Sequence, residues 1–333
     1  MKILITGGSG FIGTNFVSEA INRGHIIYNI DNLSLFQKDQ NKKNKNYIFD
    51  KIDIRNKNSL NEIFNRFKPN KVIHMAAESH VDNSIRNPDD FITTNIMGTY
   101  NVLQASLEFF KSKNSTKNFC LHHVSTDEVF GSLKKNEKSF TEESKYKPNS
   151  PYSASKAGSD HLVRAWSHTY SLPCTITYCT NNFGPYQYPE KFIPVIILSG
   201  IMKKRIPIYG TGKNIRDWIF VQDHVNALLD IMEQNFIDKT YAIGSNDEKE
   251  NIDIVDIICD LLDKKLDVTH SHKNLKLYVK DRLGHDFRYS INTSLIENEV
   301  KWKPQYNFLN GIKKTIDWYL INKDWCADLL KAK

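Results

Sequence analysis

A glycine-rich turn between an apolar strand and an amphipathic helix is the feature that most restricts the fold of this chain. Gly7, Gly10 and Gly13 follow the apolar run 3–5 and lead into a segment, from residue 12, whose apolar side chains recur at helical spacing. Glycine lets the backbone pack close to a pyrophosphate, and the N-terminus of the helix adds unpaired N–H groups that attract phosphate. The turn therefore predicts a dinucleotide-binding βαβ unit at the start of the chain.

An acidic residue at the end of the next strand indicates which dinucleotide binds. Asp31 closes the strand candidate 25–31. A carboxylate there can accept hydrogen bonds from the two ribose hydroxyls of NAD and would repel the 2′-phosphate of NADP. A turn that merely lets strand and helix pack closely explains the glycines but not the acid, so NAD is the predicted cofactor. Asp53 and Ile54 follow a third strand candidate, 47–52, and either contact the adenine edge or are a surface acid beside a core isoleucine.

Strand-like and helical segments alternate through the first half of the chain. Helical stretches such as 90–111 separate apolar strand candidates at 71–77, 119–125 and 174–180. This alternation predicts an α/β fold, a Rossmann-type doubly wound parallel sheet. After residue 180 the pattern loosens into turn-rich segments with helices of their own. We expect an NAD-binding domain carrying the catalytic residues over 1–180 and a smaller α/β substrate-binding lobe over 181–333, with a crossing of the chain between them left open.

The composition is that of an ordinary globular chain rather than a fibrous or disordered one. Of 333 residues, 40% are hydrophobic and 25% are charged. The longest apolar stretch, 192–202, contains Pro194, Ser199 and Gly200 and is shorter than the roughly 18 residues of a membrane span. The N-terminus lacks the apolar core of a signal peptide. We therefore expect a cytoplasmic protein without a membrane partner. Five cysteines without a Cys-x-x-Cys pair predict reduced buried thiols and no metal site.

A net charge of +7 raises the question of an anionic partner. The charge would be explained if the chain were a catalytically silent NAD-binding protein that holds RNA or DNA. However, the chain shows no basic helix, no ordered platform of aromatic and basic side chains, and no zinc module. Much of the lysine excess lies in solvated stretches such as 37–46, one of two expected polar surface insertions; the other is 134–147. We expect no nucleic-acid partner.

A tyrosine and a lysine share one face of a predicted helix. Ser150 and Pro151 suit the N-cap and first position of a helix that runs to about residue 170. Tyr152 and Lys156 then stand four residues apart, on the same face. A phenol titrates near pH 10 and becomes a useful base only where a nearby ammonium, helped by a nicotinamide cation, stabilises the phenolate. In isolation the pair could be an exposed helix pair, but downstream of the glycine turn it predicts a catalytic base.

A hydroxyl and two acids follow the strand candidate 119–125. Thr126, Asp127 and Glu128 stand at its carboxyl end, the edge where doubly wound sheets bind ligands. Adjacent carboxylates at such a junction point in different directions, so one can remove a proton from carbon while the other, held protonated, gives a proton to a leaving hydroxyl. The alternative is two acids in a solvated turn. The acid pair favours a dehydratase over a simple epimerase or dehydrogenase.

With these motifs in place, the chain resembles the nucleotide-sugar 4,6-dehydratases of the extended short-chain dehydrogenase/reductase family. The resemblance runs nearly end to end. It rests on ordered blocks that include GGSGFIGTN (7–15), AAESHVDNSI (76–85), TNIMGTYNVLQ (94–104), VSTDEVFG (124–131), SPYSASKAGSDHLV (150–163), NNFGPYQYPEKFIP (181–194), IRDWIFVQDH (215–224) and DRLGHDFRYSIN (281–292).

The resemblance implies a redox-neutral lyase reaction on a nucleotide-activated glucose. NAD-mediated oxidation at C4, loss of water across C5 and C6, and hydride return to C6 would give a 4-keto-6-deoxy sugar. Tyr152 would deprotonate the C4 hydroxyl with Thr126 and Lys156 beside it, Glu128 would remove the C5 proton, and Asp127 would protonate the departing C6 hydroxyl. dTDP-glucose is the expected substrate. UDP-glucose, and a 4-epimerase that uses the same tyrosine and lysine without the acids, are the alternatives.

The resemblance also places the binding residues. Contacts to NAD are implied for Gly7, Gly10, Phe11, Ile12, Gly13, Asp31, Asp53, Ile54, Ala76, Ala77, Thr94, Tyr152 and Lys156. Contacts to the sugar, diphosphate and nucleoside are implied for Ser84, Thr126, Asn182, Arg216, Asn251, Arg282 and His285. Considered as isolated residues, the two arginines would be surface charges and the histidine would be solvated.

Some positions depart from the family pattern. Asn83 stands where many members have Arg, Gln222 where they often have Glu, and Leu283 where Pro is usual; the stretch 37–46 also differs from the family's loop after the second strand. These departures leave the nucleotide open between dTDP and UDP. The family further implies a homodimer that pairs the helices expected at 90–111 and 152–170.

Overall fold

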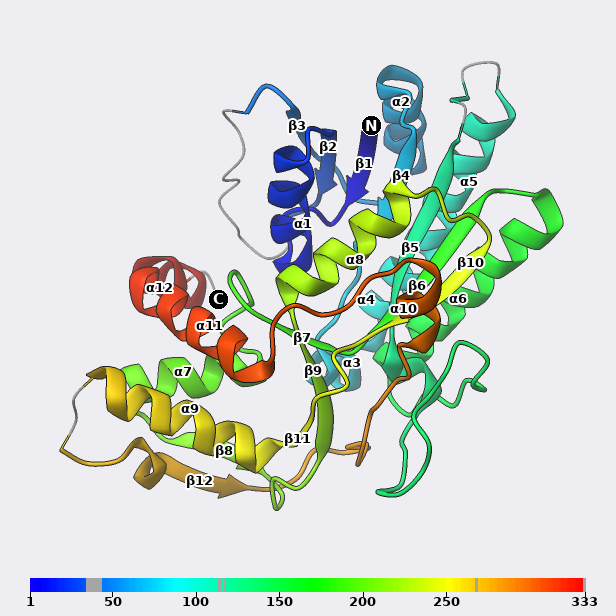
Figure 1. Ribbon diagram of the computed structural model, residues 1–333. Helices are drawn as coiled ribbons and strands as arrows, with labels where there is room; N and C mark the ends of the chain where they lie inside the picture. Colours follow the sequence, from blue (N-terminus) through cyan, green and yellow to red (C-terminus); the bar gives the residue numbers. More distant parts are fainter. Residues whose placement is uncertain (34–43, 113–114, 117, 267–268, 332–333) are drawn as a thin grey trace.

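A parallel sheet forms the centre of the computed structural model, which describes residues 1–33, 44–112, 115–116, 118–266 and 269–331 (Figure 1). Within these residues, seven strands lie in the order β10-β6-β5-β4-β1-β2-β3, and every pairing between them is parallel. The strands are β1 (Lys2–Thr6), β2 (Ile26–Asp31), β3 (Tyr47–Lys51), β4 (Lys71–His74), β5 (Cys120–Thr126), β6 (Cys174–Cys179) and β10 (Lys239–Ile243). The strand order reverses between β1 and β4, where doubly wound sheets bind ligands beyond the carboxyl ends of the strands. The predicted fold class is confirmed.

Helices cover both faces of this sheet because its strands are apolar on both sides (Figure 1). In β1, Leu4 packs into the core under α2 (Lys57–Phe67), α5 (Thr99–Lys111) and α6 (Pro151–Tyr170). Its neighbours Ile3 and Ile5 pack into the opposite core, under α1 (Phe11–Asn22), α8 (Val221–Glu233) and α10 (Ser294–Glu299). The alternation of side chains along each strand thus builds two cores.

The helical stretch expected at 90–111 is divided. It consists of α4 (Pro88–Phe91), a π-helical segment (Ile92–Gly98) and α5, after the short α3 (Val81–Arg86). π-Helical turns are rare and occur mostly at functional sites. The segment ends at Gly98, where a Cβ atom would lie 2.4 Å from Ile54 Cδ1, so glycine allows the helix to approach the loop after β3. Periodicity alone had not predicted this irregularity.

A third core lies in the smaller part of the molecule, at the lower left of Figure 1. Its strands are β7 (Asn181–Phe183), β9 (Ile215–Phe220) and β11 (Glu248–Glu250) in one sheet, and β8 (Ile206–Tyr209) and β12 (Lys276–Val279) in another. Its helices include α7 (Phe192–Ile201), α9 (Asn251–Leu266), α11 (Phe308–Ile321) and α12 (Lys323–Lys331). Because α8 and β10 return to the large sheet after β9, the chain passes between the two parts more than once; the division at residue 180 stays a prediction.

Two polar surface insertions were expected, at 37–46 and 134–147. Most of 37–46 lies outside the described residues. The stretch 134–147 is largely exposed, but Phe140 pairs with Ile291 in a β-bridge and its ring packs 5.2 Å from Phe130. This stretch is therefore attached to the C-terminal part of the chain rather than freely solvated.

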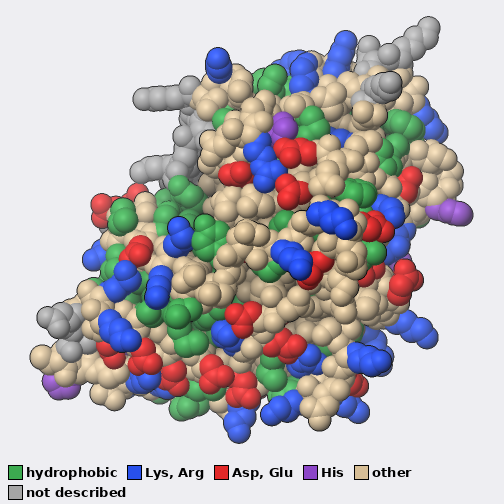
Figure 2. Space-filling view, in the orientation of Figure 1, with side chains coloured by type: hydrophobic (Ala, Val, Ile, Leu, Met, Phe, Trp, Pro, Cys, Tyr) green, Lys and Arg blue, Asp and Glu red, His purple; other side chains and the backbone are tan. Residues whose placement is uncertain are grey.

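Surface charge and hydropathy fit the composition. On the face drawn in Figure 2, Lys and Arg side chains are interspersed with Asp and Glu rather than gathered in one basic patch. Among the helices of the described residues, none combines the length and the apolarity needed to cross a membrane. All five cysteines are buried free thiols.

Candidate active site

Two adjoining cavities lie beyond the carboxyl ends of the central strands. The first, of about 340 Å³, is lined by every residue predicted to contact NAD except Asp53: Gly7, Gly10, Phe11, Ile12, Gly13, Asp31, Ile54, Ala76, Ala77, Thr94, Tyr152 and Lys156. The second, of about 240 Å³, contains five of the predicted substrate residues: Asn182, Arg216, Asn251, Arg282 and His285. Both cavities share Glu128, Asn182 and Lys191. A ligand in one cavity can therefore react with a ligand in the other at this junction.

The glycine turn leaves no room for side chains. Gly7 has a φ of +77°, and a Cβ atom on it would lie 2.7 Å from the Ala76 backbone nitrogen. A Cβ atom on Gly13 would lie 2.2 Å from the carbonyl oxygen of Gly7. No side chain caps α1, whose first residues line the first cavity. The open helix N-terminus and the bare backbone fit a bound pyrophosphate, as the sequence predicts.

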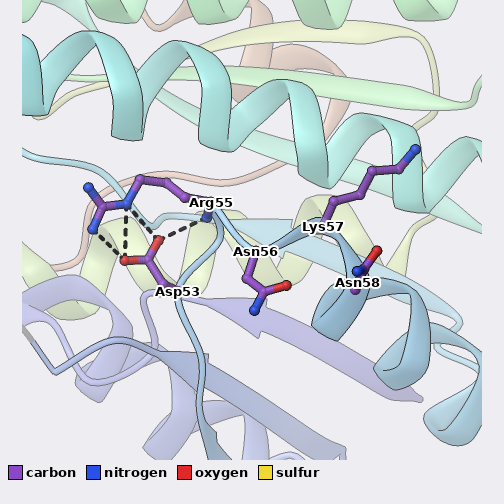
Figure 3. A pocket seen from close by; sticks show the side chains of 5 residues that line it. All are labelled: Asp53, Arg55, Asn56, Lys57 and Asn58. Carbon is purple, nitrogen blue, oxygen red and sulfur yellow. Dashed lines mark hydrogen bonds and ion pairs between the residues drawn. The ribbon is translucent and has the colours of Figure 1, made fainter.

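Asp31 and Asp53 lie in different surroundings. The Asp31 carboxylate accepts hydrogen bonds from the backbone N–H groups of Ser9 (3.0 Å) and Leu33 (2.8 Å), lines the first cavity, and has its pKa raised by burial. Asp53 instead forms an ion pair with Arg55, Nη2 to Oδ2 2.7 Å, in a shallow surface hollow shown in Figure 3. Hydrogen bonds from Arg55 hold the pKa of Asp53 low. Asp31 is placed to bind a ribose, whereas the adenine contact of Asp53 stays a prediction.

The two acids do not lie in a solvated turn, since Asp127 is buried and Glu128 is partly buried. Thr126 ends β5, and its hydroxyl accepts a hydrogen bond from the Glu128 backbone N–H (3.3 Å) at the start of the 3₁₀ turn Asp127–Phe130. Asp127 is 2% exposed, and its Oδ2 has no hydrogen-bond partner in the described part of the chain. Burial, and then the charge of Glu128, raise the pKa of Asp127 well above its usual value. Burial and Glu128 therefore favour the protonated form of Asp127, which suits a proton donor.

Glu128 has different surroundings from those of Asp127. It lines both cavities, and burial raises the pKa of its carboxyl. The positive charges of Arg216 and Lys191 oppose that rise and favour the carboxylate. Of the two acids, Glu128 is thus the better placed to act as a base.

Tyr152 and Lys156 come from the first turns of α6, as predicted. Ser150 caps the helix and exchanges hydrogen bonds with Ser153, and Pro151 occupies its first position. The Lys156 ammonium donates to the carbonyl oxygen of Val124 (2.9 Å). Burial, and then the acids Glu128 and Asp127, raise the pKa of the Tyr152 phenol well above its usual value. The phenol therefore needs positive charge in addition to that of Lys156 before it can act as a base, and a nicotinamide cation would provide it.

The second cavity holds cationic side chains in fixed positions. Arg216 is 7% exposed, donates to the carbonyl oxygen of Asp286 (2.9 Å), and lies 4.2 Å from the centre of the Tyr289 ring. Arg282 forms an ion pair with Asp82, Nε to Oδ1 2.6 Å, across the cavity. Arg216 is therefore not the surface charge that it would be if considered alone, and both guanidinium groups line a cavity large enough for part of a nucleotide.

Two further polar residues line the same cavity. The Oδ1 atom of Asn251, at the start of α9, is buried and has no hydrogen-bond partner in the described part of the chain. His285 pairs with Asp281, Nδ1 to Oδ1 2.7 Å. A buried acceptor without a partner suits a site that a polar ligand completes.

One predicted substrate residue lies apart from the rest. Ser84 is fully buried on α3, and its hydroxyl donates to the carbonyl oxygen of Val81 (2.7 Å). It lines neither cavity, because the turn of α3 directs its side chain back into the helix. Its contact with the sugar stays a prediction.

The sequence analysis missed residues at the junction. Lys191 donates from Nζ to the carbonyl oxygen of Ser79 (2.9 Å), and His80 lies 3.3 Å from Glu190. These residues join the loop after β4 to the loop before α7. They stand within two of the quoted sequence blocks, yet a lysine or histidine in a loop has no periodic spacing that would single it out.

Three of the departures from the family pattern lie outside the two cavities. In the part of the chain that the structure describes, Asn83, Gln222 and Leu283 line neither cavity. The same part contains no group of three His, Cys, Asp or Glu side chains that could hold a metal ion.

Comparisons with known proteins agree with this geometry. Residues 4–315 match the family model described as GDP-mannose 4,6 dehydratase. A dTDP-glucose 4,6-dehydratase from Shigella flexneri is 46% identical over 99% of this chain and 95% of its own length. The crystal structure of a dTDP-glucose 4,6-dehydratase from Bacillus anthracis, in complex with NAD, has a TM-score of 0.87 at 38% identity and covers 99% of both chains. One from Streptomyces venezuelae, also with NAD bound, has a TM-score of 0.90 at 35% identity and covers 99% of this chain and 100% of its own.

Proposed function

Since this chain belongs to the GDP-mannose 4,6-dehydratase family, we propose that it is an NAD-dependent lyase that converts dTDP-glucose to dTDP-4-keto-6-deoxy-glucose with loss of water. The observation that carries the proposal is a pair of acids with unequal surroundings: Glu128 lines both cavities at their junction, whereas Asp127, its neighbour in the chain, is buried and lines neither. A dehydrogenase or epimerase has no use for such a pair. The names of the relatives favour dTDP over UDP as the nucleotide.

The first chemical step depends on Tyr152. NAD, when bound, would supply the acceptor for the C4 hydride and the source of the hydride that returns to C6, and a solvent-derived proton would add to C5 in that last step. Tyr152, as the phenolate that Lys156 stabilises, removes the proton of the C4 hydroxyl and becomes a phenol, and Thr126 positions the same oxygen. The product of this step is a 4-keto sugar, whose carbonyl makes the proton on C5 acidic.

The acid pair then eliminates water. Glu128, as a carboxylate, takes the C5 proton, and the electron pair of that bond forms the C5–C6 double bond. The C6–O bond breaks, and Asp127 gives its proton to the departing oxygen, which leaves as water. The raised pKa of Asp127 and the cationic neighbours of Glu128 support this division of roles.

The Glu128→Gln variant tests the assignment. We expect product formation to fall roughly 10²- to 10⁴-fold, while oxidation at C4 persists and is seen as a transient absorbance of reduced nicotinamide. Glu108→Gln removes a carboxylate that pairs with Lys57 at the surface of α5 and is the matched control. Elimination at the wild-type rate in Glu128→Gln would refute the role of this residue.

Nucleotide preference and reaction type need separate measurements. Rates of 4-keto sugar formation from dTDP-glucose and from UDP-glucose, compared at equal concentration, decide the nucleotide, and faster turnover of UDP-glucose would reverse the proposal. The product mass decides between dehydratase and 4-epimerase. A dehydratase product is lighter than its substrate by one water, whereas an epimerase product has the same mass.

We also propose that the chain acts as a homodimer. Exposed apolar side chains lie on the π-helical segment, Ile92 (45% exposed) and Met97 (51%), and at the end of α6, Tyr170 (42%). These belong to the two helical stretches expected to pair. Light scattering should give about twice the chain mass of 38.6 kDa. Met97→Asp should give the monomer, and Ile321→Asp, at an exposed position on α11, should not. A monomeric wild type would refute the pairing.

A cytoplasmic location is the last part of the proposal. Its support is the five buried free thiols, which a reducing compartment preserves. Cell fractionation followed by immunodetection tests it, and recovery of the chain outside the cytoplasm would refute it.

A further inference from the structure

A buried polar network lies behind the catalytic lysine, on the side away from the first cavity. It contains a carboxylate, Asp160, that is 0% exposed, stands one helical turn after Lys156 on α6, and lines neither cavity. A fully buried charge is unfavourable unless it is paired and hydrogen-bonded. The partners of Asp160 therefore show what the network is built to hold.

An imidazole lies between one carboxylate oxygen of Asp160 and the ammonium of Lys156. His123 Nε2, on β5, lies 3.1 Å from Asp160 Oδ1 and 3.4 Å from Lys156 Nζ. The imidazole is itself 0% exposed. The imidazole thus lies between the ammonium and the carboxylate inside the fold, and Asp160 Oδ1 has no hydrogen-bond partner in the described part of the chain.

The other oxygen of Asp160 is held by hydroxyl groups. Oδ2 accepts hydrogen bonds from Ser125 Oγ (2.8 Å) and from the Tyr146 phenol (3.0 Å). Tyr146 is also 2.5 Å from the Tyr178 phenol, which accepts from Arg164 (3.0 Å). Arg164 stands one further turn along α6 and is exposed. Charged groups of alternating sign at positions 156, 160 and 164 thus connect the active site to the surface.

We propose that Asp160 is a positioning residue for the catalytic lysine: from the other side of the His123 imidazole, its carboxylate is the buried counter-charge that keeps Lys156 protonated and directed at Val124, beside Tyr152. The inference rests on the proposed function, in which the Lys156 ammonium stabilises the Tyr152 phenolate. It explains how the buried Lys156 ammonium keeps its proton.

The charges around the pair agree with this role. Burial lowers the pKa of Lys156, and Asp160 is the first group that opposes the fall. Burial raises the pKa of Asp160, and Lys156 is the first group that opposes the rise. Cys179, on β6, also faces the lysine. The remaining groups on this side are the two histidines His74 (β4) and His123, and burial holds the pKa of both well below the usual value. Both are therefore neutral, and the carboxylate of Asp160 is the negative charge.

A variant that removes the charge of Asp160 but keeps the shape of its side chain tests the proposal. In Asp160→Asn we expect the alkaline limb of the kcat against pH profile to move down by about one pH unit or more, because Lys156 loses its proton at lower pH. Asp160→Glu, which keeps the charge, should restore the limb. Asp230→Asn, which removes a carboxylate paired with Arg23 at the surface, should leave the profile unchanged. A merely structural pair would lower the rate equally at all pH values, and that result would overturn the proposal.

A second readout does not depend on turnover. Titration of ¹³Cε-labelled lysine by NMR, with the Lys156 signal assigned by its loss in Lys156→Met, should give a lower lysine pKa in Asp160→Asn than in the wild-type protein. An unchanged value overturns the inference. A wild-type protein that does not turn over dTDP-glucose overturns the proposed function instead, and the NMR titration still decides the role of Asp160.

A third variant covers the case in which Asp160→Asn does not fold. Tyr146→Phe removes one hydrogen-bond donor to the carboxylate and leaves every charge in place. Asp160 should then take up its proton at higher pH, so the acid limb should move up while the alkaline limb stays. A profile with both limbs unmoved overturns the proposal.

Discussion

The two cavities are built in different ways. The first is lined by residues at the ends of β1, β2, β4 and β5 and the starts of α1 and α6, which are neighbours within βαβ units. The second draws on residues far apart in the chain; its Asp82–Arg282 ion pair joins positions separated by 200 residues. Backbone geometry defines the first cavity, whereas the second is defined by contacts between distant segments, such as the Asp82–Arg282 ion pair and the Arg216 guanidinium over the Tyr289 ring.

This difference assigns separate tasks to the two cavities. The rigid strand ends hold the groups that move protons and hydride, for which small displacements matter most. The second cavity holds cations that match an anionic nucleotide. Changes in the first should therefore reduce kcat or cofactor retention, and changes in the second should raise KM.

The largest expected effect is that of Tyr152→Phe in the first cavity. Loss of the base should lower kcat roughly 10³-fold, because general-base catalysis of the removal of the C4 proton is lost. The rate of 4-keto sugar formation measures it, and an NAD content equal to that of the wild type shows that the cavity is intact. A kcat within tenfold of wild type would contradict the role of this phenol.

Gly13→Ala should break the first cavity through its backbone. The added Cβ atom would lie 2.2 Å from the Gly7 carbonyl oxygen, a contact that only a backbone shift relieves. We expect a loss of about 3 kcal/mol in the free energy of unfolding, measured with denaturant, and loss of NAD on purification. Gly24→Ala is the control for NAD retention: its φ of +82° makes alanine there destabilising as well, but a Cβ atom has no neighbour within 4 Å, so the variant should keep its NAD. Retention of NAD by Gly13→Ala would argue against the close approach.

Arg216→Ala tests the second cavity. The KM for dTDP-glucose should rise roughly tenfold, with kcat changed less, because a charge-assisted contact to the diphosphate is lost. Arg205→Ala, which removes an exposed guanidinium bonded to the Asn274 carbonyl oxygen, should change neither constant. A fall in kcat at unchanged KM would show that Arg216 acts in the chemical step rather than in binding the nucleotide. The contrast between the two cavities would then be lost.

The smallest effect concerns an ion pair outside both cavities. Burial would raise the pKa of Glu248, but Arg288, at 2.5 Å, holds it below its usual value. A lowered pKa in the folded state stabilises the protein above the pKa of the unfolded chain, and that stability is lost as the pH falls through the folded-state pKa. Glu248→Gln should therefore lose about 0.5 kcal/mol at pH 7 and almost nothing near pH 3. Equal losses at both pH values would show that the charge is not the cause.

Local patterns predicted the first cavity better than the second. The glycine spacing, the Ser150–Pro151 helix start and the four-residue spacing of Tyr152 and Lys156 each depend on residues close together in the chain, and the structure has them as expected. The junction residue Lys191 and the inward turn of Ser84 depend on contacts between distant segments. The π-helical segment had no sequence signal, since its apolar spacing is that of an ordinary helix.

By itself, the sequence determined the parallel sheet and the glycine turn that binds the cofactor. It also determined that Thr126 and the two acids follow a strand and that Tyr152 and Lys156 begin a helix. These features follow from periodicity and local sterics. Only the tertiary structure decided which of these groups are charged. Asp127 and Glu128 are adjacent in the chain, yet burial and the charge of Glu128 favour the protonated form of Asp127, while Arg216 and Lys191, brought from other segments, favour the ionised form of Glu128. The ionisation of a carboxyl depends on the dielectric and the charges around it, and folding sets both.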